Sequence, residues 1–333
     1  MRSVFIPMVF IRNAIIATIL TILWPVTGGA DVTLFQEPFE DTNFASRGWY
    51  DTTGGGLSTT VKYAGTRSLE CHFLVGGMTC NGGNPGRRLF TETDSVYLSY
   101  YIKHSTNWVG SGKAYHPHMF YFLTNQDDAY RGMAYTHLTS YVEEVGGVPT
   151  FIIQDGVNID ETRIGVDLTN VTEQRAVAGC NGDSDGYGNG TCYVAGRVHW
   201  NGKFWTPGGQ VYFNSTPGSP YYKGDWHHVE VYFKLNNLVG GKGAKDGIIR
   251  YWYDGTPIMN HSNVVFRTGS YPTMKFNQLV ISPWIGDGSP ADQTYWIDNL
   301  TIATAPLVTP VSGGADPPPL PKKPNPPVNI QLR

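Results

Sequence analysis

Apolar side chains recur at every second position in several runs of this chain of 333 residues, and the alternation restricts the fold to β structure. The pattern is clearest in residues 96–103, 226–234 and 247–254. Because successive side chains of a strand point to opposite faces, each run has one apolar face and one face that can meet water. No helical period longer than a turn or two interrupts the pattern.

Turn residues separate these runs. The chain has 40 glycines and 22 prolines, and Asp254-Gly255 between two runs predicts a tight hairpin turn into residues 256–259. Further strands are expected at residues 68–75, 276–282 and 294–302. We therefore predict an all-β fold, a two-sheet antiparallel β-sandwich of the jelly-roll type in a single domain.

The two ends of the chain differ from its middle. Residues 1–30 carry two arginines before or beside an apolar segment and end in small residues, which is typical of a cleaved signal peptide. We expect a secreted, extracellular protein with no membrane association after cleavage; a retained anchor is the alternative, although a span needs ~20 apolar residues. Residues 31–303 then form the β domain, and residues 304–333 form a proline-rich disordered tail.

Composition narrows the class of partner. The formal net charge is -3 and no basic run stands out, which argues against a nucleic-acid-binding protein. Aromatic residues make up 13% of the chain and charged residues only 15%, which suits a turn-rich β domain with an aromatic surface.

Four cysteines, Cys71, Cys80, Cys180 and Cys192, allow three disulfide pairings. The local pairing, which joins the first two and the last two, is the simplest because each pair brackets a loop rich in glycine and asparagine. Disulfides imply an oxidising compartment. The spacings do not fit a zinc site.

The richest run of proton-transfer groups and aromatics lies in residues 112–122. His116 and His118 are one residue apart in an extended run, which puts both imidazoles on one face. Phe120 and Phe122 share that face, so either the histidines are buried with them or the strand turns at Pro117.

Residues 226–230, 246–255 and 295–302 resemble the concanavalin A-like jelly roll. Within that superfamily the chain most resembles polysaccharide lyases of the heparin-lyase, glucuronan-lyase and alginate-lyase kind, over residues 31–303. The resemblance implies a substrate groove across a concave sheet and β-elimination on a uronate-containing polysaccharide. A non-catalytic carbohydrate-binding, lectin-like or adhesion module of the same fold is the alternative.

One motif of related glucanases is missing. Retaining hydrolysis needs paired carboxylates on one strand face, written Glu-x-Asp-x-x-Glu in those enzymes. Here Glu143 and Glu144 are adjacent and face opposite ways, and Glu230 has no acid two or four residues later. Hydrolysis of that kind is the weakest of the three functions we consider.

β-Elimination requires a base, an acid and a group that neutralises the uronate carboxylate. We expect a histidine as the base, because its side chain titrates near neutral pH. Tyr121 or Tyr135 would be the acid, and Arg131 and Lys113 would hold the carboxylate. The predicted catalytic residues are His116, His118, Tyr121, His137, Arg131 and Lys113.

A second set of side chains is expected to bind the substrate. These residues lie opposite the apolar positions of their strands, or are tryptophans whose rings could stack on sugars; for each tryptophan, core packing is the alternative. Five members of this set are expected to form the second wall of a groove whose first wall is residues 113–122, namely His228, Glu230, Tyr232, Arg250 and Trp252. The set is Trp108, Tyr135, His228, Glu230, Tyr232, Arg250 and Trp252.

Two groups of oxygen ligands predict a structural calcium ion. Asn181, Asp183 and Asp185 alternate as at the start of an EF-hand loop, although Cys192 stands where that loop has glutamate. A polar turn closed by a disulfide is the alternative. By resemblance alone, Glu40 or Asp41 would join Asp298 in a second site between the first and last strands.

Overall fold

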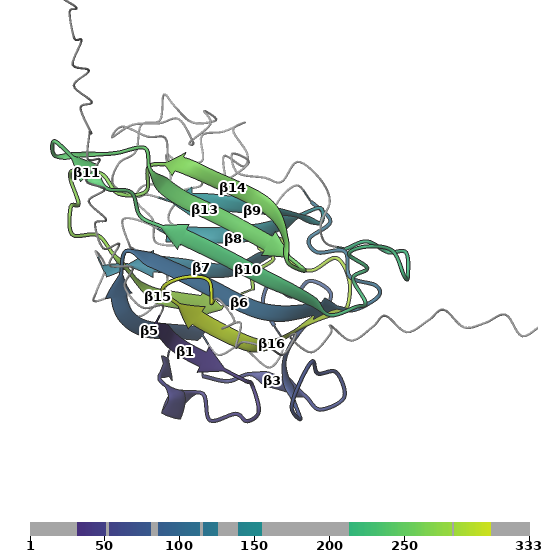
Figure 1. Ribbon diagram of the computed structural model, residues 1–333. Coiled ribbons are helices and arrows are strands. Elements are labelled where there is room, and N and C mark those ends of the chain that lie inside the picture. Colours follow the sequence, from purple (N-terminus) through teal and green to yellow (C-terminus); the bar gives the residue numbers. More distant parts are fainter. Residues whose placement is uncertain are drawn as a thin grey trace, which may run out of the picture. The chain divides into compact units, whose positions relative to one another are not determined.

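The computed structural model describes residues 32–50, 53–80, 86–113, 116–125, 139–154, 213–281 and 283–307. In these residues two large antiparallel sheets pack face to face (Figure 1), which confirms the all-β sandwich. Among the described residues, no helix has the length and apolar character needed to cross a membrane. The predicted signal peptide and almost all of the proline-rich tail lie outside them.

The first sheet has eight strands and contains the first and last strands of the described residues. Its strands run in the order β14 (Thr256–Val264), β13 (Gly247–Tyr253), β10 (His227–Lys234), β6 (Ser95–His104), β16 (Gln293–Ala303), β4 (Ser68–Phe73) and β3 (Gly56–Ser58), with β1 (Thr33–Glu37) beside β16.

The second sheet has six strands. Its order is β2 (Trp49–Tyr50), β5 (Gly86–Thr93), β15 (Phe276–Ile281), β7 (His118–Thr124), β8 (Thr139–Val145) and β9 (Val148–Gln154). A short 3-10 helix, η1 (Ala45–Arg47), precedes β2, and a small hairpin joins β11 (Leu238–Val239) to β12 (Lys242–Gly243).

The core lies between the sheets and is rich in aromatic rings. Phe120 of β7 contacts Tyr100 of β6 at 6.3 Å between ring centroids, and Phe122 contacts Phe233 of β10 at 6.0 Å. Edge-to-face contacts of this kind add to the free energy gained by burying apolar area. The even-numbered side chains Phe120 and Phe122 of β7 therefore face the eight-stranded sheet.

The alternation pattern predicted the central strands within one or two residues. The predicted hairpin is also confirmed, because Tyr253 pairs with Thr256 across Asp254-Gly255. Asp254 and Gly255 have φ angles of 50° and 73°, the left-handed conformations that a two-residue hairpin of this kind requires.

One predicted disulfide is present. Cys71, at 1% exposure, is joined to Cys80 with their Cα atoms 4.9 Å apart. The bridge ties β4 to the loop that follows it. Cys180 and Cys192 lie outside the described residues, so their pairing stays a prediction.

A buried acid and a buried histidine meet between the sheets. Glu144 of β8 approaches the ring of His104 on β6, with 3.3 Å between Oε2 and Nε2, and neither side chain is exposed. A buried carboxylate is costly unless a partner compensates it. The contact therefore links the two sheets, and removing either partner would leave the other polar side chain buried without it.

We expect His104→Leu to lower the free energy of unfolding by roughly 3–5 kcal/mol, because it leaves the Glu144 carboxyl buried without this partner. Urea denaturation of both proteins measures the difference. His72→Leu is the matched control, since the contact of His72 with Asp292 is partly exposed and its loss should cost less than about 1 kcal/mol. Equal losses in the two variants would contradict this account of the core.

Candidate functional site

The start of β7 breaks the regular alternation of side chains. Pairing with β8 shifts in register between His118 and Phe120, so an extra residue stands on β7 at this point. Phe120 faces the core, whereas His118 bonds to Tyr121, which is on the opposite face of β7. The prediction that His118 shares a face with Phe120 and Phe122 is therefore wrong, because the bulge rotates His118 out of that row.

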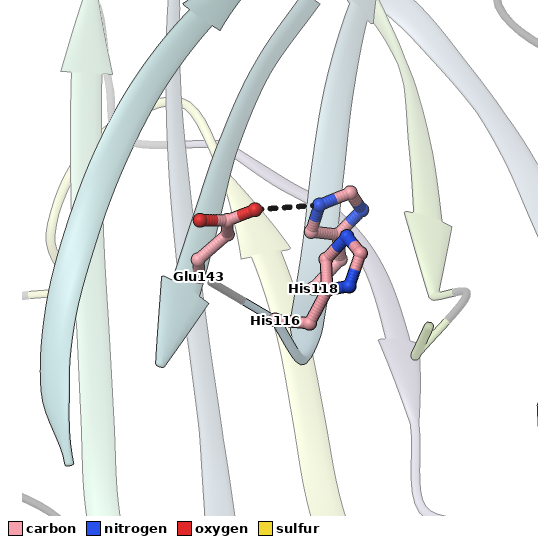
Figure 2. Close-up of side chains that lie close together, drawn as sticks. All are labelled: His116, His118 and Glu143. Carbon is pink, nitrogen blue, oxygen red and sulfur yellow. Dashed lines mark hydrogen bonds and ion pairs between the residues drawn. The ribbon is translucent and has the colours of Figure 1, made fainter. Parts of the chain in front are cut away.

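His118 lies between a carboxylate and a phenol. Its Nε2 is 2.7 Å from Oε1 of Glu143 on β8, as Figure 2 shows, and its Nδ1 bonds to the hydroxyl of Tyr121. A carboxylate accepts but does not donate, so Nε2 carries the proton and Nδ1 accepts from Tyr121. His118 and Glu143 are 2% and 1% exposed, whereas Tyr121 is partly exposed. The Glu143–His118–Tyr121 relay thus leads from a buried acid to a tyrosine that is partly exposed.

His116 packs against the relay. Its ring centroid is 4.6 Å from that of His118, and the backbone N–H of Gly286 donates to its Nδ1 at 2.8 Å. The segment around Gly286 is held against β7 by two backbone hydrogen bonds between His118 and Trp284. His116 is therefore fixed from two sides while remaining partly exposed.

Lys113 stands at the rim of this cluster. Its Nζ is 2.8 Å from the carboxylate of Asp287, the residue after Gly286, and half of its side chain is exposed. Asp287 follows Gly286, whose backbone N–H binds His116, so the Lys113–Asp287 ion pair is linked to His116 through two consecutive residues.

The ligand atoms of His116, His118 and Glu143 lie within 4.8 Å of one another, a spacing that a transition-metal ion could bridge. The hydrogen bonds of these side chains favour proton transfer over metal binding. Since Nδ1 of His116 accepts from Gly286, its proton stands on Nε2, and Nε2 of His118 is protonated toward Glu143. A metal ion would have to displace the protons on these two nitrogens, whereas proton transfer uses them as they stand.

Burial controls the charge of the central histidine. It lowers the pKa of His118 from its usual 6.5 to about 3, because an imidazolium loses its hydration inside the protein. His118 is therefore neutral near pH 7 and can accept a proton at Nδ1.

The predicted second wall lies on a different face of the molecule. His228, Glu230 and Tyr232 alternate with Val229, Val231 and Phe233, whose side chains fill the core. They point away from the six-stranded sheet, as do Arg250 and Trp252 on the next strand. A groove between them and residues 113–122 is therefore excluded, because the sandwich core separates the two sets.

Trp108 is also corrected. It has no exposed surface and packs against Phe73, His104 and Tyr295 in the core. It cannot stack on a sugar, and the core-packing alternative holds for this residue.

The structure therefore brings together His116, His118 and Tyr121, with Lys113 beside them. Arg131, Tyr135 and His137 lie outside the described residues, and their roles stay predictions. Sequence reasoning missed Glu143 as a member of the site. The available signal was that adjacent Glu143 and Glu144 must face opposite ways, one inward and one outward.

The three carboxylates of the second calcium prediction are bound by donors of the chain itself. Asp298 accepts the backbone N–H groups of Tyr63 and Ala64 at 2.8 and 3.1 Å. Glu40 is bound by Thr66 and Asp41 by Arg47. The structure does not test whether these carboxylates also bind calcium, so the second site stays a prediction. Asn181, Asp183 and Asp185 lie outside the described residues, and that prediction stays open.

Comparison with known proteins gives only distant similarities to solved structures. No protein-family model matches the chain, and no curated protein matches it. The similar solved structures include the alginate lyase vAL-1 from Chlorella virus, with 11% identity, a TM-score of 0.46 and coverage of 82% of this chain and 99% of that one. An alginate lyase from Aplysia kurodai has 13% identity, a TM-score of 0.46 and coverage of 82% and 100%.

A carbohydrate-recognition domain is also among the similar structures. That of Emp47p has 10% identity, a TM-score of 0.32 and coverage of 75% of this chain and 88% of that one. All of these similarities have TM-scores below 0.5, and they assign neither a family to the chain nor a role to any residue.

The low pKa of His118 predicts a loss of stability in acid. As the pH falls below about 6.5 the unfolded chain binds a proton at this imidazole, whereas the folded protein does so only near pH 3. The stabilisation is complete above pH 6.5 and declines from there to pH 3, by up to about 1.4 kcal/mol per pH unit. Urea denaturation across this range should show a shallower decline for His118→Gln than for the wild type or for His72→Gln. Identical slopes would mean that Glu143 offsets the cost of burying the charge.

Proposed function

We propose that the protein is a polysaccharide lyase that cleaves a uronate-containing polysaccharide by β-elimination. The observation that supports this most is the Glu143–His118–Tyr121 relay, in which a buried carboxylate orients a neutral histidine toward a partly exposed tyrosine. A tyrosine hydroxyl that can both give and take a proton suits β-elimination, in which one proton leaves C5 and one is delivered to the leaving oxygen.

Tyr121 would contact the substrate and move the proton. As its hydroxyl proton passes to Nδ1 of His118, the phenolic oxygen takes the proton from C5 of the uronate. The C5–H electron pair forms the C4=C5 double bond while the bond from C4 to the leaving oxygen breaks. Tyr121 then protonates the leaving oxygen, and His118 returns its proton to Tyr121. One proton has moved from carbon to oxygen, and the protein is unchanged.

Glu143 would act through His118 and so is a positioning residue. Full proton transfer from Tyr121 to His118 is costly, because burial disfavours the imidazolium and lowers the pKa of His118. The transfer would therefore proceed together with proton abstraction from C5, while the Glu143 carboxylate stabilises the developing imidazolium, in the manner of a catalytic triad.

The uronate carboxylate must be neutralised before its neighbouring C–H becomes acidic enough to react. Lys113 would serve here, because its ion pair with Asp287 is half exposed and a substrate carboxylate could exchange into it. Arg131 would add a bidentate contact, as the sequence predicts.

We also propose that the protein acts outside the cell. The Cys71–Cys80 disulfide supports this, since such bonds persist in oxidising compartments. The predicted signal peptide is consistent with it.

The mature protein should release unsaturated uronyl products, followed by their absorbance, from alginate, glucuronan or a heparin-type polymer. Tyr121→Phe removes the transferable proton and should lower kcat by roughly 100-fold or more. Glu143→Gln should lower kcat less, with little change in KM, because it disturbs the tautomer of His118 and not a substrate contact.

Tyr222→Phe is the matched control, since Tyr222 is a partly exposed tyrosine outside the relay and should retain wild-type activity. Unchanged turnover in Tyr121→Phe would show that the relay is not catalytic. A protein that binds a glycan but releases no unsaturated product from the panel would instead be the lectin-like alternative.

A further inference from the structure

A pocket of about 540 Å³ opens on the outer face of the eight-stranded sheet. It lies where β1, β6, β10 and β16 meet, and its volume is in the range of small-molecule sites. The residues that line it are Gln36, Glu37, Pro38, Ser99, Tyr101, His228, Asn299, Leu300 and Thr301. None of them belongs to the relay, which is on the outer face of the other sheet.

Part of the wall is rigid. The ring of Tyr101 is stacked between Tyr63, at 3.5 Å between centroids, and His228, at 4.6 Å. His228 is tied further by its Nε2, which is 2.7 Å from the hydroxyl of Ser99. A wall already fixed in place loses little conformational entropy when a ligand binds.

Another part of the wall carries polar side chains that can hydrogen-bond a ligand. The side chains of Gln36, Asn299 and Thr301 make no hydrogen bond to the part of the chain that the structure describes. Two amides and a hydroxyl can each both donate and accept. This combination matches neighbouring hydroxyl groups of a sugar ring, which also donate and accept.

The pocket presents little charge. The Glu37 carboxylate is fully buried and accepts from Arg47 at 2.8 Å and from Trp49 at 2.9 Å. No lysine or arginine is in the lining, and burial lowers the pKa of His228. A carboxylate ligand would therefore find no cation here, whereas a neutral hydroxylated ligand would find partners for its hydroxyls.

We propose that this pocket binds a neutral sugar unit of a polysaccharide, as a second glycan site separate from the relay. This second site is distinct from the lyase function, because its side chains would recognise uncharged hydroxyl groups and not a uronate. Such a site would hold the protein on a neutral polymer of a mixed matrix while the other face acts on the acidic one.

The test measures binding in a protein that cannot turn over substrate. Tyr121→Phe is produced in a host without N-glycosylation, because Asn299-Leu300-Thr301 is a glycosylation sequon inside the pocket. Calorimetry then follows binding of a soluble β-glucan, a soluble mannan and alginate. We expect binding of at least one neutral polymer, and Gln36→Ala with Thr301→Val should weaken it roughly tenfold through two lost hydrogen bonds.

Thr256→Val, at an exposed position on β14 outside the pocket, is the matched control and should bind as the parent does. Thermal unfolding of each variant verifies that the fold is intact. No binding of either neutral polymer, or equal affinity in the pocket variant and the control, would overturn the proposal. Because binding is measured without turnover, this result and the lyase assay can fail independently.

Discussion

The candidate site depends on one extra residue at the start of β7. Strict alternation would place His118 in the row of Phe120 and Phe122, where it would meet the aromatic side chains of β6 and β10. The register shift against β8 instead brings it to Tyr121 and Glu143. A bulge of this kind re-aims a side chain without disturbing the strand beyond it, so the core packing is retained while a polar group is turned outward.

Two adjacent acids then connect the core with the site. Glu144 points inward to His104 of the opposite sheet, and Glu143 points outward to His118. Both are buried, so each needs its histidine to offset the cost of desolvation. The two contacts restrain β8 from both faces, which holds the Glu143 carboxylate where it can orient His118. The stability of the sandwich and the geometry of the relay thus depend on the same strand.

The sequence was sufficient for the central strands and for the faces of their side chains. Periodicity predicted the central strands and the Asp254-Gly255 hairpin, and it sorted His228, Glu230 and Tyr232 correctly from the core side chains. It could not say which strands share a sheet, because register with a partner is a long-range property. For that reason the predicted groove joined two faces that the core separates.

The burial and contacts of residues outside regular strands were harder still to predict. Trp108 follows β6, where no alternation reports its burial, and a bulge is visible only against the partner strand. Glu143 was considered for hydrolysis alone, so its pairing with His118 was missed.

The central claim is that His118 is a neutral acceptor between Glu143 and Tyr121. Nitrogen-15 NMR of the histidine rings in the mature protein tests it directly. We expect a proton on Nε2 of His118 and none on Nδ1, unchanged from pH 8 down to about pH 4, with the Nδ1 signal shifting in Tyr121→Phe. A proton on Nδ1, or a doubly protonated ring near pH 7, would contradict it.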